Sequence, residues 1–197
     1  MRVELSGVAK GRAALPATTL EFASGELTLA EAETAERPTV LGLIASGRMR
    51  PDRGEVRVDG ETDAARLRRE LALVDAPAVS EPPPGVTLAA VAAEELMFAG
   101  RWPSRRAVRA VLAELGAASD ADTRMADLAP ATRVRVLAEL ALLRPGVRGL
   151  VVVAPDRHGG EPAAWRAHLT AIAERGVAVL AVIGRPALAA LEPWSAE

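Results

Sequence analysis

Two short, uninterrupted apolar runs constrain the fold of this chain more than any other feature. One is LVVV at residues 150–153, and the other is VAVLAVI at residues 177–183. A strand that is apolar on both faces must be covered on both sides, as happens in parallel sheets flanked by helices. Helical patterns cover residues 130–143 and 162–174, next to these runs. The sequence therefore predicts an α/β domain with a central, mainly parallel sheet.

The N-terminal part alternates apolar and polar residues, which is typical of half-buried strands. The alternating positions are Val3 and Leu5, then Leu20 and Phe22, then Leu27 and Leu29, with Gly25 in the turn between the second and third pairs. We expect a helix over residues 37–46, a strand over 55–58, a short helix over 64–70 and a strand over 71–74. A last short helix is expected near the C-terminus.

A break at EPPPG, residues 81–85, separates this part from a helical stretch. Helical patterns cover residues 88–98, 104–115 and 130–143. We predict one domain over residues 1–197, in which 1–76 and 145–197 form the core and about 77–144 form a small helical subdomain.

Composition excludes several classes of function. Half of the 197 residues are hydrophobic, which is enough for a sizeable core, and the net charge of −2 argues against a nucleic-acid-binding face. The arginines at 48, 50 and 53, and those at 66, 68 and 69, form clusters that we interpret as solvated surface. The chain has no cysteine and two histidines, and we predict no metal site. It has no signal-peptide pattern and no apolar run of about 18–20 residues, so we expect a soluble cytoplasmic protein.

The order of these elements and four strings resemble the ATP-binding subunits of ABC transporters. The strings are LEFASGELTLA (20–30), VLGLIASGRMRPDRGEVRVDG (40–60), PPGVTLAAVAAEELMFAGR (83–101) and LAPATRVRVLAELALLRPGVRGLVVVAP (128–155). The likeness covers residues 3–192. It implies a P-loop NTPase-like ABC ATPase core, with N-terminal antiparallel strands and a small helical subdomain.

In this register the phosphate loop has lost its chemistry. The family pattern GxxxxGK[ST] wraps phosphates with backbone N–H groups and holds them with its lysine. Here Ala32 and Arg37 replace the glycines and Pro38 replaces the lysine, so that Thr39 alone matches. Thr39 is therefore the one weak candidate for nucleotide binding. The acids Glu31, Glu33 and Glu36 lie where a triphosphate would need positive charge.

The other motifs implied by the resemblance are also replaced. Val153 and Ala154 occupy the positions of the Walker B acids, and residues 128–132 (LAPAT) occupy the position of the signature motif. Ala76 replaces the Q-loop glutamine, Gly184 replaces the switch histidine, and Ala9 or Lys10 replaces the aromatic that stacks on adenine. Asp156 is the nearest acid to the Walker B position, and we interpret it as a turn residue or helix cap. We therefore predict no catalytic residue.

We expect a non-catalytic pseudo-ATPase that docks on a membrane permease or on a catalytic paralogue, with dimerisation possible. It would be peripheral at the inner face of the membrane through that partner. Three side chains keep two interpretations each: Arg133 can be structural or functional, His158 can form a turn or act chemically, and Trp102 can be a binding hot spot or part of a local cluster.

Two alternatives remain from the sequence. One is an ATPase that binds Mg·ATP through a divergent phosphate loop. The other is a regulatory module that binds a cation or a basic peptide at the acidic segment 31–36.

Overall fold

The computed structural model describes residues 1–33 and 37–191, and it contains two sheets of different type. The first is antiparallel, in the order β2-β1-β4, and consists of β1 (Arg2–Lys10), β2 (Leu15–Ala23) and β4 (Arg53–Val58). The second is parallel throughout, in the order β3-β7-β6-β5. Its strands are β3 (Leu27–Glu31), β5 (Leu71–Val74), β6 (Gly149–Val153) and β7 (Ala178–Ile183). The predicted fold class is confirmed.

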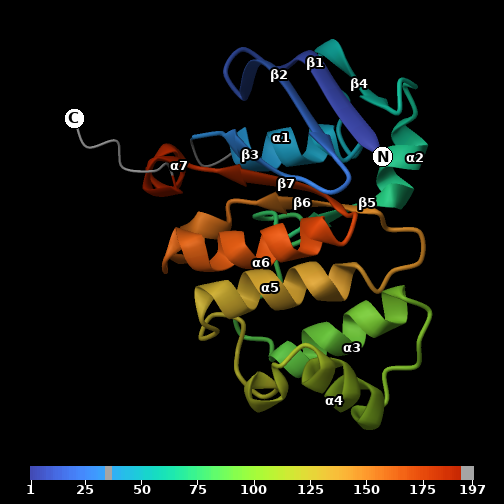
Figure 1. Ribbon diagram of the computed structural model, residues 1–197, viewed down its shortest axis with the longest axis vertical. Coiled ribbons are helices and arrows are strands. Elements are labelled where there is room, and N and C mark those ends of the chain that lie inside the picture. Colours follow the sequence, from blue (N-terminus) through green and yellow to red (C-terminus); the bar gives the residue numbers. More distant parts are fainter. Residues whose placement is uncertain (34–36, 192–197) are drawn as a thin grey trace.

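Helices cover both faces of the parallel sheet, as the apolar runs require (Figure 1). Helix α1 (Arg37–Ala45) lies between this sheet and the antiparallel one, while α5 (Pro130–Ala141) and α6 (Pro162–Glu174) cover the opposite face. Beyond α5 lie α3 (Leu88–Phe98) and α4 (Arg105–Glu114). The short helices α2 (Ala64–Glu70) and α7 (Arg185–Leu191) lie at opposite sides of the molecule, and 3₁₀ turns cover Ala118–Asp120 and Pro155–His158.

Strand residues divide between two apolar clusters because successive side chains point to opposite faces of the sheet. One cluster lies between the sheet, α1 and the antiparallel sheet; its members from β5, β6 and β7 are Leu71, Leu73, Val151, Val153, Ala178, Leu180 and Val182. The other lies under α5 and α6; its strand members are Ala72, Val74, Leu150, Val152, Val179, Ala181 and Ile183. Every residue of β5, β6 and β7 is buried.

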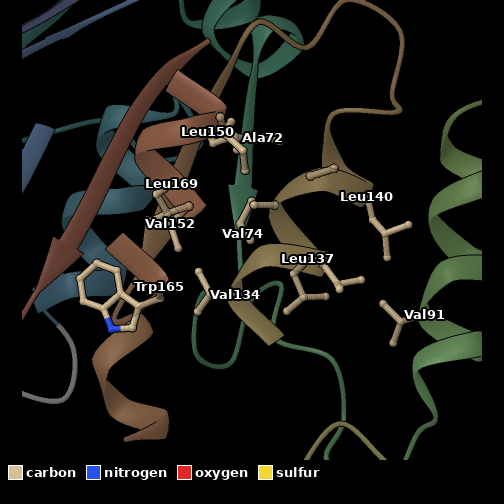
Figure 2. Packing of buried hydrophobic residues seen from close by; sticks show 14 of the residues in the cluster. Ala72, Val74, Val91, Val134, Leu137, Leu140, Leu150, Val152, Trp165 and Leu169 are labelled. Carbon is tan, nitrogen blue, oxygen red and sulfur yellow. The ribbon is translucent and has the colours of Figure 1, made fainter. Parts of the chain in front are cut away.

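The second cluster continues past α5 into the helical stretch (Figure 2). Val134 of α5 lies on the side of the strands, whereas Leu140 lies on the side of Val91 in α3. The same cluster includes Val108, Val111 and Leu112 of α4. The outer helices are therefore attached to the sheet through one continuous apolar contact.

Helix α1 approaches the sheet closely because of Gly42. A Cβ atom at this position would lie 2.7 Å from Val153 Cγ2 and 3.2 Å from Leu73 Cδ1. Any larger residue would push the helix away from β6. Among residues 1–33 and 37–191, no helix is long and apolar enough to cross a membrane.

Candidate functional site

The carboxyl ends of the four parallel strands form one edge of the sheet, and this edge holds the positions that the sequence singled out. Glu31 ends β3, Val74 ends β5, Val153 ends β6 and Ile183 ends β7. Helix α1 begins at the same edge, after β3. Ligands of open α/β sheets bind outside such carboxyl ends, so this edge is the candidate site.

The predicted phosphate loop lies between β3 and α1, and residues 34–36 of it, including Glu36, are outside the described part of the chain. Pro38 is buried in the first turn of α1, where it supplies no N–H group. The hydroxyl oxygen of Thr39 is buried and has no hydrogen-bond partner among the described residues. Thr39, the one residue that the sequence suggested for nucleotide binding, thus lies on α1 beside the loop, but its hydroxyl is not accessible to solvent.

Arg185, at the start of α7, pairs with two acids, one at the end of β3 and one just after it. Its Nε donates to Glu31 Oε1 at 3.1 Å, and its backbone N–H donates to Glu33 Oε1 at 3.2 Å. The hydrogen bond to Glu31, with the charges of Glu31 and Glu33, raises the pKa of the Arg185 guanidinium. An adjoining cavity of about 210 Å³ is lined by these three residues and by Arg37, whose Nε donates to Ala13 O at 3.2 Å. The described lining therefore carries two acids and two bases.

Asp75 is the centre of a buried ion-pair network at the other half of the edge. It follows β5 with a φ of +55°, and its side chain is 1% exposed. Arg133 of α5 binds it through two guanidinium nitrogens: Nε lies 3.0 Å from Oδ2 and Nη2 lies 2.7 Å from Oδ1. Nη1 of Arg133 donates to Met125 O at 2.8 Å. Arg157 adds a contact from its Nη2 to Asp75 Oδ1 at 3.1 Å.

His158 and Glu81 complete this network. His158 Nε2 lies 2.9 Å from Asp75 Oδ2, and Glu81 Oε1 lies 3.1 Å from Arg157 Nη2. Burial disfavours the ionised Asp75 carboxylate, but hydrogen bonds from His158 and Arg133 and the charge of Arg157 outweigh burial, and the pKa of Asp75 is lowered. The carboxylate is thus held ionised by side chains from two other elements: the helix α5 and the 3₁₀ turn after β6.

Asp75, Glu81 and His158 each place one possible metal ligand within 4.8 Å of the other two. Both oxygens of Asp75 already face cationic or hydrogen-bonding side chains, and two arginines lie in the same cluster. A divalent cation there would have to displace or oppose these positive charges. The donor set therefore fits an ion-pair network and does not fit a metal centre.

Asp156 lies between the two halves of the edge and fixes the chain after β7. Its Oδ2 accepts a hydrogen bond from the Gly184 N–H group at 3.1 Å. A Cβ atom at Gly184 would lie 3.0 Å from the same oxygen. Asp156 thus belongs to a turn, in the 3₁₀ segment Pro155–His158, as its interpretation as a turn residue or cap requires.

The network around Asp75 is the part of the edge that sequence reasoning did not find. Arg133 and His158 had been singled out, each with two interpretations, and the structure brings both to one carboxylate. The available signal was an arginine among the apolar residues of a helix, because a buried arginine needs an acidic partner.

A second surface adjoins the Asp75 half of the edge and combines a groove with exposed apolar side chains. The groove has a volume of about 340 Å³ and runs between the loop after β5 and α3, where its lining includes Val79, Glu94 and Phe98. Phe98 is 56% exposed and stacks on the Arg144 guanidinium at 4.8 Å. Trp102 is 85% exposed, which excludes its interpretation as part of a local cluster. Met97 is exposed next to them.

Known proteins were compared with the chain at the level of sequence and of structure. No protein-family model matches the sequence, and no curated protein is detectably similar to it. Solved structures do match. An ATP-binding subunit of an ABC transporter has a TM-score of 0.62 and 18% identity, and the match covers 96% of this chain and 82% of that one.

Two further structures agree with this match. A nucleotide-free ATP-binding cassette from an ABC transporter has a TM-score of 0.66 and 16% identity, with 94% of this chain and 82% of that one covered. A bacterial ABC-transporter cassette in a dimeric structure has a TM-score of 0.63 and 19% identity, with 92% and 87% covered. At such identities the likeness concerns the fold alone. This chain has the fold of ABC-transporter ATP-binding cassettes, as its sequence resemblance implied.

Proposed function

We propose that this protein is a non-catalytic, pseudo-ATPase subunit of a membrane transport complex. It would keep the cassette fold as a scaffold and dock on a membrane permease, on a catalytic paralogue, or on both. The observation that carries the proposal is the pairing of charges at the carboxyl edge. Among the described residues there, Asp75 is held by Arg133, Arg157 and His158, and the acids after β3 are held by Arg185.

This pairing opposes nucleotide binding for an electrostatic reason. Catalysis of phosphoryl transfer depends almost entirely on positioning and on cations that stabilise the phosphate oxygens. The described lining next to the predicted phosphate loop has no excess positive charge, because Arg37 and Arg185 are matched by Glu31 and Glu33. A triphosphate placed there would lie next to the carboxylates of Glu31 and Glu33, which repel its charge.

The residues at the predicted Mg²⁺ and water-activating positions support the same proposal. Val153 and Ala154 bring no oxygen ligand, and Ala154 has a left-handed backbone with φ of +47°. The nearby Asp156 is bound to the Gly184 N–H group. The family chemistry would need acids at positions 153 and 154 and a histidine at position 184, where this sequence has valine, alanine and glycine.

The docking surface is proposed to be the groove beside α3 with its apolar rim. Exposed tryptophan and phenylalanine side chains next to arginine are typical of interface hot spots. Val79 and Phe98 lie at the groove, and Trp102 follows shortly after α3. A partner that covers this rim could be the permease, which would place the protein at the cytoplasmic face of the membrane. A cassette of the same fold forms a dimeric structure, which supports a paralogue as the second partner.

The first test is the thermal midpoint of the purified chain with and without millimolar Mg·ATP. A ligand at 100 times its dissociation constant stabilises a protein by about 2.7 kcal/mol. For a domain of this size that corresponds to a rise of about 5–11 °C in the midpoint. We expect no rise.

Two controls separate nucleotide from other effects: Mg²⁺ alone, and ATP with a chelator. A rise that requires Mg·ATP and disappears in a Thr39→Ala variant would contradict the proposal. The protein would then be an ATP-binding cassette with a divergent phosphate loop.

A further inference from the structure

Another cavity lies away from the carboxyl edge. It has a volume of about 550 Å³ and lies among the C-terminal end of α1, the strand β4 and the helix α2. Ligand pockets in proteins are typically about 300–1,000 Å³. The Arg48 guanidinium that borders the cavity donates to the carbonyl oxygen of Leu71, the first residue of β5, at 3.0 Å. The cavity therefore faces the amino end of the parallel sheet, where the candidate site and its charges are absent.

The floor of this cavity is apolar. Ile44, Leu67 and Val56 close it from below with 0%, 1% and 8% exposure, and the half-buried Met49 and Pro51 keep apolar surface that faces the cavity. Such a floor favours a hydrocarbon group over water.

Three arginines of the two clusters seen in the sequence meet at the rim of the cavity: Arg48, Arg50 and Arg68. Arg48 Nη1 donates to the carbonyl oxygens of Ser46 and Leu71, and Arg68 Nη1 donates to Gly47 O at 2.9 Å. The Arg50 side chain makes no hydrogen bond to a described residue. Within residues 1–33 and 37–191, none of the three arginines has a carboxylate partner. Each therefore keeps N–H donors for an external anion.

The two acids of the lining are already engaged. Asp52 accepts from Lys10 Nζ at 2.6 Å and from the Gly11 N–H group at 2.9 Å, and these bonds lower its pKa. Glu55 pairs with Arg57 at 2.8 Å. Neither acid is left to neutralise the rim arginines, so the cavity has excess positive charge above an apolar floor.

We propose that this cavity binds a small anionic amphiphile, a single carboxylate or phosphate on a short apolar chain. The guanidinium groups would hold the anion, since arginine forks match both anions in geometry. The apolar chain would lie over Met49, Pro51 and Val56. The proposal is independent of nucleotide binding, because the cavity shares no lining residue with the acidic loop or the Asp75 network.

The test is a titration of the uniformly ¹⁵N-labelled full chain, followed by NMR, with hexanoate and with hexyl phosphate. We expect saturable shifts confined to residues lining the cavity, including the amides of Gly47 and Gly54. The double substitution Arg50→Ala/Arg68→Ala removes two exposed side chains and should weaken binding by about tenfold or more. The matched control is Arg69→Ala on the same helix, outside the lining, which should bind as the wild type does.

The choice of anion follows from which of the two titrants saturates at lower concentration. Hexanol and inorganic phosphate test the two halves of the proposal separately. Hexanol binding as tightly as hexanoate would overturn the role of the arginines. Inorganic phosphate binding as tightly as hexyl phosphate would mean an adventitious ion only. The absence of saturable shifts with both amphiphiles would overturn the site itself, whatever the outcome with Mg·ATP.

Discussion

Asp75 shows how much a single residue contributes at the carboxyl edge of this sheet. Its carboxylate is almost completely buried, and Arg133, which is 4% exposed, binds it through a bidentate ion pair. A buried charge that loses its partner is strongly destabilising, by about 3–5 kcal/mol. The residue thus holds the loop after β5 against α5 and against the turn after β6.

Replacing Asp75 by Asn should destabilise the protein in a pH-dependent way. The pKa of Asp75 is lowered in the folded state, so its contribution to the free energy of unfolding is present above the unfolded-state pKa of about 3.9 and is lost as pH falls through the folded-state value. We expect a loss of about 3–5 kcal/mol at pH 7, because the buried Arg133 guanidinium loses the carboxylate that binds it with two hydrogen bonds. The difference between wild type and variant should shrink below about pH 4.

Urea denaturation at a series of pH values measures this difference. The control is Glu94→Gln, an exposed acid without an ion pair in the described chain, which should leave the free energy of unfolding nearly unchanged. Curves for wild type and Asp75→Asn that stay parallel from neutral to acid pH would show that the carboxylate does not act through its charge.

At the scale of the elements, the sequence predicted the strands and helices well because each is specified by its own residues. The segments that form β6 and β7 are apolar throughout. Short segments of this kind are typical of strands that are buried on both faces of a parallel sheet. The partner of β3 could not be predicted. Leu27 and Leu29 indicate a strand, but their neighbours in the sheet are Val179 and Ala181, about 150 positions away.

The same reason limits the prediction of the candidate site. Asp75 and Arg133 are 58 positions apart, and no local pattern links them. The resemblance implied the order of the elements, and this order brings the ends of the four parallel strands to one edge. It could not show which charges pair there, because the order of the elements does not fix the positions of individual side chains.

Substitution of Gly42 by Ala tests the close approach of α1 to the sheet. A helix-interior alanine is favoured over glycine by about 1 kcal/mol, but the added methyl would lie 2.7 Å from Val153 Cγ2. Overpacking costs about 1–3 kcal/mol, so we expect a net loss of about 1 kcal/mol in the free energy of unfolding, measured by urea denaturation.

Gly85→Ala is the matched control, because a Cβ atom there meets nothing within 4 Å. Its stability should change by less than about 0.5 kcal/mol. If Gly42→Ala proved more stable than wild type, α1 would be free to move away from β6.

At the scale of the whole molecule, one apolar cluster joins the parallel sheet to α3 and α4 through α5 (Figure 2). The groove beside α3 is lined both by Leu73 and Val74 of β5 and by Val91 and Phe98 of α3. A partner that binds this groove would therefore contact the sheet and the outer helices at once. This arrangement suits a rigid platform better than a hinged one.

Charge introduced at the rim of this groove should abolish docking and leave the fold intact. For Phe98→Asp/Trp102→Asp we expect binding to membrane vesicles from the source cells to weaken by about 30-fold or more, as for a hot spot worth 2 kcal/mol. Sedimentation of the labelled chain with the vesicles measures this. Arg12→Asp, exposed on the hairpin between β1 and β2, is the control.

Vesicles stripped of protein by protease distinguish a protein partner from lipid. Binding should be lost on stripping. Equal binding by wild type and the rim variant, or binding that survives the protease, would contradict docking on a membrane protein through this face.

The bond from the Gly184 N–H group to Asp156 also limits how this chain could change over evolutionary time. A side chain introduced at 184 would bring a Cβ atom to 3.0 Å from Asp156 Oδ2, so the Asp156 side chain would have to shift to admit it. A change at 156 would in turn leave the Gly184 N–H group without its acceptor. We therefore expect these two positions to change together.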